Sequence, residues 1–142
     1  MHVCWGNYAG PHHLDVPLAE IIDIVFEARP AAILFEAANP RHAHEWKVFR
    51  DTELPPGKVL IPGVIDSTTP YIEHPALVAE RIVQFATVAG PENVIAGVDC
   101  GFGTSAEWAP IDSRIVFAKL RSLVEGAALA SRELWGAASP SA

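Results

Sequence analysis

The sequence contains few cysteines, and those it has are far apart. Its 142 residues include only Cys4 and Cys100, with no secretory context around them. Such a pair is more typical of reduced thiols or metal ligands than of a disulfide framework. Two buried, unreactive cysteines are the alternative, since free cysteine often packs as a small apolar residue.

Clustered positive charge and long apolar runs are also missing. The ten Lys and Arg residues are scattered and the formal net charge is -7, which argues against nucleic acid or an anionic membrane as a partner. No apolar stretch reaches the roughly 18 residues of a membrane span, and the N-terminus does not resemble a signal peptide. We therefore expect a cytoplasmic location.

No internal repeat, low-complexity block or linker divides the chain, so residues 1–142 are expected to form a single unit with a frayed tail at 137–142. Four short runs rich in β-branched or aromatic residues predict strands at 2–5, 32–35, 58–65 and 94–98. A helix signal follows each run. The order is therefore βαβαβαβα, an α/β fold with a parallel sheet.

Caps and apolar spacing place the four helices. Pro17 opens the first, Asn39 and Pro40 cap and open a shorter one, and Pro75 starts a third that ends near Gly90. Asp112 caps the last helix. The short second helix should run through Trp46 and Phe49, and the last should bury a stripe of Val116, Leu120, Leu123, Val124 and Ala127.

This alternation fits either an open doubly wound sheet or part of a (β/α)8 barrel. Glu36, Asp66, Asp99 and Cys100 all fall at the ends of predicted strands, where barrel enzymes place their chemistry, which favours the barrel. A full barrel has eight units and about 250 residues, whereas this chain has four units. A candidate ligand as early as His2 suggests that other units normally precede these. We expect half of a barrel.

One histidine, one glutamate and two cysteines form a candidate metal site. His2 and Cys4 accompany the first strand, and Glu36 and Cys100 follow the second and fourth. Imidazole, carboxylate and thiolate are the side chains that bind zinc, and a tetrahedral site can use ligands far apart in sequence. The sulfur-rich set indicates thiol chemistry. A closed site, in which zinc only holds strands together, is the alternative.

Four segments together resemble the C-terminal catalytic barrel of the cobalamin-independent methionine synthases: His2-Val3-Cys4, Phe35-Glu36, Gly63-Val64-Ile65-Asp66 and Asp99-Cys100-Gly101. The resemblance covers the second half of that TIM (β/α)8 barrel. It implies a zinc ion held by His2, Cys4, Glu36 and Cys100. It also implies methionine biosynthesis, in which a methyl group passes from a folate-type donor to the thiol of homocysteine.

Two other functions remain open. Epoxide-opening transferases that use coenzyme M share the His-x-Cys and later cysteine pattern, so the substrates could be another small thiol and an epoxide. A third interpretation is a noncatalytic half-barrel or partner subunit. It would dock on a complementary half-barrel, or form a homodimer, to cover its edge strands.

Asp66 and His74 are the candidate catalytic residues. In the family that the sequence resembles, a histidine thought to act as a general acid lies two residues after the aspartate. This chain has Thr68 at that position, and a threonine hydroxyl cannot supply a proton at neutral pH. His74, in the same loop, could replace it. Asp66 and Asp99 could orient a ligand or a substrate amine, or simply cap their turns.

The remaining histidines and the loop aromatics have weaker assignments. His12, His13, His42 and His44 form no second ligand motif and are expected in loops or on helix surfaces. Tyr71, Phe102 and Trp108 are expected in loops near the site, where they could wall an apolar pocket.

Overall fold

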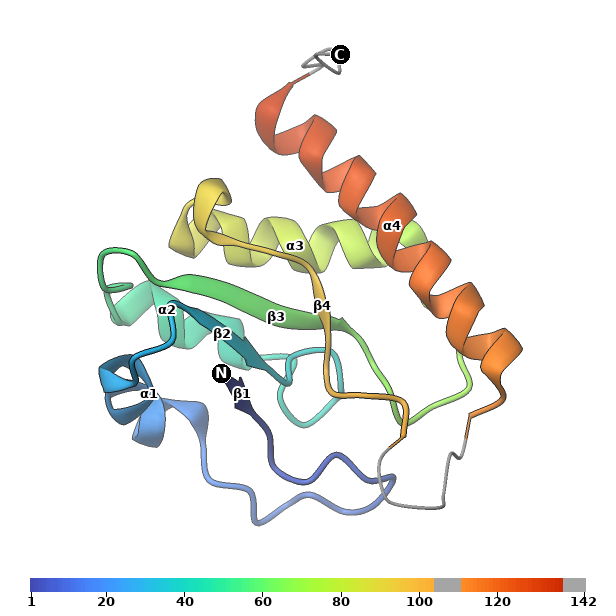
Figure 1. Ribbon diagram of the computed structural model, residues 1–142, viewed down its shortest axis with the longest axis horizontal. Coiled ribbons are helices and arrows are strands. Elements are labelled where there is room, and N and C mark those ends of the chain that lie inside the picture. The colour runs from blue at the N-terminus through green and yellow to red at the C-terminus, as the bar shows by residue number, and fades with distance from the viewer. Residues whose placement is uncertain (104–110, 137–142) are drawn as a thin grey trace.

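The computed structural model describes residues 1–103 and 111–136, so Trp108 and the predicted tail at 137–142 lie outside the described residues. Strands alternate with helices, as the sequence predicts (Figure 1). The elements are β1 (His2–Val3), α1 (Leu18–Glu27), β2 (Ala32–Phe35), η1 (Glu45–Lys47), α2 (Val48–Asp51), β3 (Val59–Ile65), α3 (Pro75–Ala89), η2 (Pro91–Asn93), β4 (Gly97–Val98) and α4 (Ser113–Trp135).

The four strands form a parallel sheet in the order β1-β2-β3-β4. A doubly wound sheet reverses its direction of growth at a switch point, whereas these described strands follow one another without reversal, as in a barrel segment. Cys4, Glu36, Asp66 and Asp99 each come directly after the last residue of a strand. Because parallel strands end at one edge, the loops that carry these residues gather at one end of the sheet (Figure 1).

Two groups of buried apolar side chains hold the helices to the sheet. The first centres on Phe35 of β2, Phe49 of α2 and Phe85 of α3, whose ring centroids lie 5.5 to 5.8 Å apart. The second joins Val64 of β3 to Val78 of α3 and Ala130 of α4. The helix α4 therefore reaches the core mainly through α3, against which it packs (Figure 1).

The predicted buried stripe of α4 is only partly confirmed: Leu123 and Ala127 are half-buried against the second core group, but none of the five predicted residues is fully buried. The buried residues of the helix are Lys119, Ser122, Gly126 and Ala130, whereas Val124 is 66% exposed. Small residues face α3 because the helices approach closely: a Cβ at Gly126 would lie 2.5 Å from side-chain atoms of Val78. Although α4 has 23 residues, neither it nor any other described helix is long and apolar enough to cross a membrane.

The predicted second helix and fourth strand are both shorter than expected. Residues 40–44 form turns, and η1 and α2 begin only at Glu45 and Val48. Asn39 does act as a cap, because its side-chain Oδ1 accepts hydrogen bonds from the backbone N of Arg41 and of His42. The fourth strand pairs continuously only at 97–98, since the register with β3 shifts near Gly63, and Val94 forms an isolated bridge.

Gly63 sets the spacing between β3 and β4. A Cβ at this position would lie 2.0 Å from Oδ1 of Asp99 and 2.6 Å from its Cα. Only glycine lets the end of β4 come this close to β3. The close approach brings the Asp99 carboxylate within reach of the loop after β2, where it organises the candidate site.

Candidate metal centre

The structure brings His2, Cys4 and Cys100 together at the carboxyl edge of the sheet. One ligand atom from each side chain lies within 4.8 Å of the others. The Nε2 atom of His2 is 3.2 Å from Sγ of Cys100, although the two residues are 98 positions apart in sequence. These side chains line a cavity of about 130 Å³. Since His2 and Cys4 are exposed, the site is open to solvent.

Glu36 joins this group through Cys100, although it is not within the tight set of three. The Sγ atom of Cys100 donates a hydrogen bond to Oε1 of Glu36 at 3.6 Å. The carboxylate is 2% exposed, and no Lys or Arg in the described part of the chain forms an ion pair with it. Its oxygens accept hydrogen bonds from the backbone N of Trp5 and from Nδ2 of Asn39.

The spacing and charge of these groups suit a soft dication. For zinc bonds of about 2.0 to 2.3 Å, neighbouring ligand atoms of a tetrahedral site lie about 3.3 to 3.8 Å apart. Burial, with Glu36 and Cys4 nearby, raises the pKa of the Cys100 thiol above its usual range. The thiolate form of Cys100 is therefore unfavourable beside the Glu36 carboxylate unless a cation is bound. The donor set fits zinc.

Asp99 fixes the loop that carries Glu36. Its Oδ1 atom accepts hydrogen bonds from the backbone N of Ala37 and Ala38, and its Oδ2 atom from the backbone N and Nδ2 of Asn39. Burial raises the pKa of Asp99 to about 6, against the lowering effect of these donors, so the carboxylate is ionised at neutral pH. Asp99 thus orients Glu36 through Asn39.

Two methionine synthases are similar to this chain. The methionine synthase of Thermococcus kodakarensis is 29% identical over an alignment of 137 residues, and the match covers 94% of this chain and 34% of that protein. The B12-independent methionine synthase of a Shewanella species, solved in complex with selenomethionine, matches with a TM-score of 0.65 and 21% identity. That match covers 82% of this chain and 31% of the other. This chain is related to the cobalamin-independent methionine synthases.

The structural match shows the fold: the four-stranded parallel sheet with its helices is similar to part of the TIM barrel of that structure. The chain spans about a third of the length of the methionine synthases it matches. No protein-family model matches it.

The two candidate catalytic residues, Asp66 and His74, both form hydrogen bonds within their own loop. Asp66 is 6% exposed, and its oxygens accept hydrogen bonds from the hydroxyls of Thr68 and Thr69 and from the backbone N of Thr68. It organises the loop after β3. His74 is exposed and caps α3, since its Nδ1 accepts a hydrogen bond from the backbone N of Ala76. His74 is not in the group formed by His2, Cys4 and Cys100.

Tyr71 and Phe102, the two residues expected in the aromatic wall that the structure describes, do not form it. Tyr71 is 80% exposed, and Phe102 packs against the second core group, beside α3 and α4. Neither lines the cavity beside His2 and Cys100.

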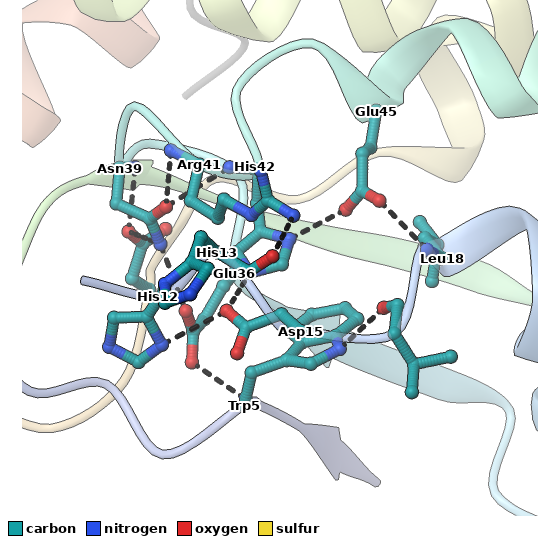
Figure 2. Close-up of polar contacts among 12 residues, drawn as sticks. Trp5, His12, His13, Asp15, Leu18, Glu36, Asn39, Arg41, His42 and Glu45 are labelled. Atoms are coloured by element: carbon teal, nitrogen blue, oxygen red, sulfur yellow. Dashed lines mark hydrogen bonds and ion pairs between the residues drawn. The ribbon is translucent and has the colours of Figure 1, made fainter.

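Sequence reasoning missed a buried network built on His42, which was expected in a loop or on a helix surface. His42 is 2% exposed and stacks on Trp5 with ring centroids 4.1 Å apart. Its Nδ1 is 2.8 Å from Glu45 Oε2, and its Nε2 is 3.1 Å from Asp15 Oδ2 (Figure 2). The spacing His42-x-x-Glu45, one helical turn, was the available signal. The network ties the loop after β1 to the loop after β2.

The stability that His42 provides should fall as the pH rises. Burial lowers its pKa, but the hydrogen bonds to Glu45 and Asp15 and the nearby charge of Glu36 outweigh burial, so the pKa is raised above the usual 6.5. A raised folded-state pKa means that the stabilisation is complete below the unfolded pKa and is lost as the pH passes through the folded value. We expect the stability difference between the natural chain and His42→Gln to shrink above about pH 6.5.

Urea unfolding at several pH values from about 6 to 9 measures this difference. The exposed His13 provides a matched control, because His13→Gln should give a small difference that does not depend on pH. A constant difference for His42→Gln across this range would contradict the expectation.

A second missed feature is the buried ion pair between Lys119 of α4 and Glu73. Lys119 is fully buried, and its Nζ lies 2.9 Å from Glu73 Oε2. The other oxygen of Glu73 accepts a hydrogen bond from the backbone N of Asp66, and its carbonyl oxygen accepts one from the hydroxyl of Ser122. The pair therefore connects α4 to the loop after β3. A lysine on the predicted apolar face of α4 was the available signal.

Proposed function

We propose that the chain binds zinc through His2, Cys4, Glu36 and Cys100 and takes part in methyl or alkyl transfer to a small thiol. The observation that carries this proposal is the convergence of one imidazole and two thiols within 4.8 Å at the carboxyl edge of the sheet. The relationship to methionine synthases supports thiol methylation as the reaction class.

The composition of the ligand set favours thiol chemistry over hydrolysis. Bound zinc would lower the pKa of a coordinated substrate thiol, so that the thiolate is present at neutral pH. Three anionic side chains and one neutral imidazole would leave the loaded site with a formal negative charge. Such a site activates water poorly but leaves sulfur electron-rich, in contrast to sites with three neutral histidines.

Glu36 is the ligand best suited to make room for the substrate thiol. A carboxylate oxygen competes less well than a thiolate for zinc. Its two oxygens already accept hydrogen bonds from Trp5 and Asn39, so the carboxylate keeps polar partners when it is not coordinated. Cys4 and Cys100 have no comparable set of N–H donors among the described residues.

The loop after β3 affects which alkyl donor is suitable. The hydroxyl of Thr68 donates to Asp66 and cannot act as an acid at neutral pH, and His74 caps α3. A folate-type donor leaves as an amine and benefits from such an acid. An epoxide is opened with relief of ring strain, and the alkoxide takes a proton from water. Thr68 therefore favours an epoxide, with coenzyme M or another small thiol, as the second candidate.

A complementary half-barrel is the proposed partner. The outer edges of β1 and β4 have no strand partner within the described residues, and exposed parallel edges invite pairing. The chain also spans only about a third of the methionine synthases that it matches. A separate half-barrel or a second copy of the chain could cover these edges. A noncatalytic half-barrel that only docks is the remaining alternative.

Zinc stoichiometry and X-ray absorption test the proposal. The purified chain should contain about one zinc with two sulfur neighbours, and addition of a small thiol should add one sulfur neighbour. Zinc whose neighbours do not change with thiol would indicate a closed structural site and overturn the proposed reaction. Sedimentation of the same preparation reports the assembly: a zinc-loaded monomer that takes up thiol would contradict the need for a second half.

A further inference from the structure

The last helix, α4, has an exposed apolar face on the side that points away from α3. Phe117 and Val124 are 71% and 66% exposed, and they share one face because seven residues are about two turns. Gly126 is the residue of α4 that lies closest to Val78 of α3. Val124 comes two residues before Gly126, which is about 200° around the helix. The apolar face therefore lies nearly opposite α3.

The first long helix, α1, has a similar face on the side that points away from α2. Phe26 of α1 packs on Phe49 of α2, with ring centroids 6.4 Å apart. Ile24 comes two residues before Phe26, so it lies on the opposite side of α1, and it is 70% exposed. The exposed Glu20 and Glu27 lie four residues before and three residues after Ile24, which places them beside it.

The charges on the two helices are opposite. Three acids and no Lys or Arg lie in α1, whereas α4 holds four of the ten basic residues of the chain and only two of its 17 acids. Arg121 is exposed and lies four residues after Phe117, at the border of the apolar face of α4. Among the described residues, Arg121, Glu20 and Glu27 form no ion pair. The two faces are therefore complementary in charge.

Barrel geometry brings these faces together only between two chains. Successive helices of a (β/α)8 barrel are neighbours, and four strands are half of its ring. A second copy that completes the ring places its β1 edge beside β4, and thus its α1 beside α4. Within one copy the two helices lie on opposite sides of the molecule (Figure 1). A pair with two-fold symmetry makes the same contact twice and is closed.

The matching residues also lie at similar heights, because the helices of a barrel run in the same direction. Ile24 is six residues after the first residue of α1, and Phe117 is four residues after the first residue of α4. Glu27 and Arg121 are nine and eight residues after those starting points. At about 1.5 Å per residue, each pair differs by no more than about 3 Å in height. Since α1 has only ten residues, Arg132 near the end of α4 lies outside the contact.

We propose that α4 docks through Phe117 and Arg121 on the face of α1 around Ile24 and Glu27 in a second copy of the chain, so that two copies complete one barrel. This inference rests on the proposed function, whose partner it identifies as a second copy instead of a separate half-barrel. Phe117 packs on the partner's Ile24, and Arg121 pairs with the partner's Glu27, so an apolar contact is flanked by a charge pair.

Exchange of the two charges tests the contact by sedimentation of the metal-free chain. We expect the natural chain to form a dimer. Arg121→Glu or Glu27→Lys alone should raise the dissociation constant at least about tenfold, because like charges then meet at both contacts. An equimolar mixture of the two variants should restore the dimer, since every contact again joins opposite charges, and this restoration also shows that both variants fold. Lys47→Glu, an equal charge change at an exposed residue of η1, should leave dimer formation unchanged.

Three results would each overturn the inference: a monomeric natural chain, a dimer that both variants leave intact, and variants that stay apart when mixed. An open series of larger oligomers would also overturn it, since a closed pair stops at two copies. Zinc binding to the same chain reports separately on the proposed chemistry. A monomer that binds zinc and takes up a thiol overturns only the dimer, whereas a dimer that binds no zinc overturns only the metal chemistry.

Discussion

Replacing Cys100 with serine is expected to lower the zinc affinity of the chain by more than about 100-fold, since loss of an outer contact to a metal ligand alone costs 10- to 100-fold. A hydroxyl is a poor zinc ligand, and Cys100 is the side chain that contacts both His2 and Glu36. Glu36→Gln should cost less, about tenfold, because two thiols and an imidazole remain. Competition with a chromophoric chelator at neutral pH measures both affinities.

The exposed carboxylate of Glu133 offers a control, since Glu133→Gln changes the charge equally but lies on α4. Its zinc affinity should match that of the natural chain. If Cys100→Ser retains zinc as well as the natural chain does, Cys100 is not a ligand, and the proposed site must be abandoned. A larger loss in Glu36→Gln than in Cys100→Ser would reverse the roles proposed for carboxylate and thiolate.

Replacing Lys119 with methionine is expected to lower the free energy of unfolding by about 3 to 5 kcal/mol. Methionine fills a similar volume, so the loss arises mainly from the Glu73 carboxylate, which stays buried without its cation. Glu73 also holds the backbone N of Asp66, so the damage should spread to the loop after β3. Urea unfolding followed by circular dichroism measures the change.

The double variant Lys119→Met with Glu73→Gln separates charge from packing. Its glutamine can still accept a hydrogen bond from Asp66 but leaves no unpaired charge, so part of the lost stability should return. Arg132→Met, on the exposed surface of α4, should change stability by no more than about 0.5 kcal/mol. A loss below about 1 kcal/mol for Lys119→Met would show that the ion pair contributes little.

Several parts of the fold could be predicted because they depend on neighbouring residues. The cap Asp112 and the first-turn proline Pro75 mark where α4 and α3 begin, since each acts on the backbone of its own turn. The strands β2 and β3 follow directly from apolar runs between turn residues. The candidate ligands were found by the same local logic, because in a parallel sheet every residue after a strand lies at one edge.

Other features depend on which surfaces meet, and periodicity gave the wrong answer there. In α4 the apolar residues predicted a stripe that includes Val124, but the close approach of α3 requires Gly126 and Ala130 at the contact, and the pair with Glu73 buries Lys119. His42 was likewise expected in a loop or on a helix surface, but its two ring nitrogens contact Glu45 and Asp15, and the ring is buried between them.

By itself, the sequence determined the order of strands and helices and the chemical types present at the strand ends. Those properties follow from local backbone preferences and from the fixed direction of parallel strands. Only the tertiary structure decided that Cys100 lies 3.2 Å from His2 and that Asp99 holds the loop of Glu36. Distances between residues tens of positions apart depend on how closely the strands and helices pack, which no single segment encodes.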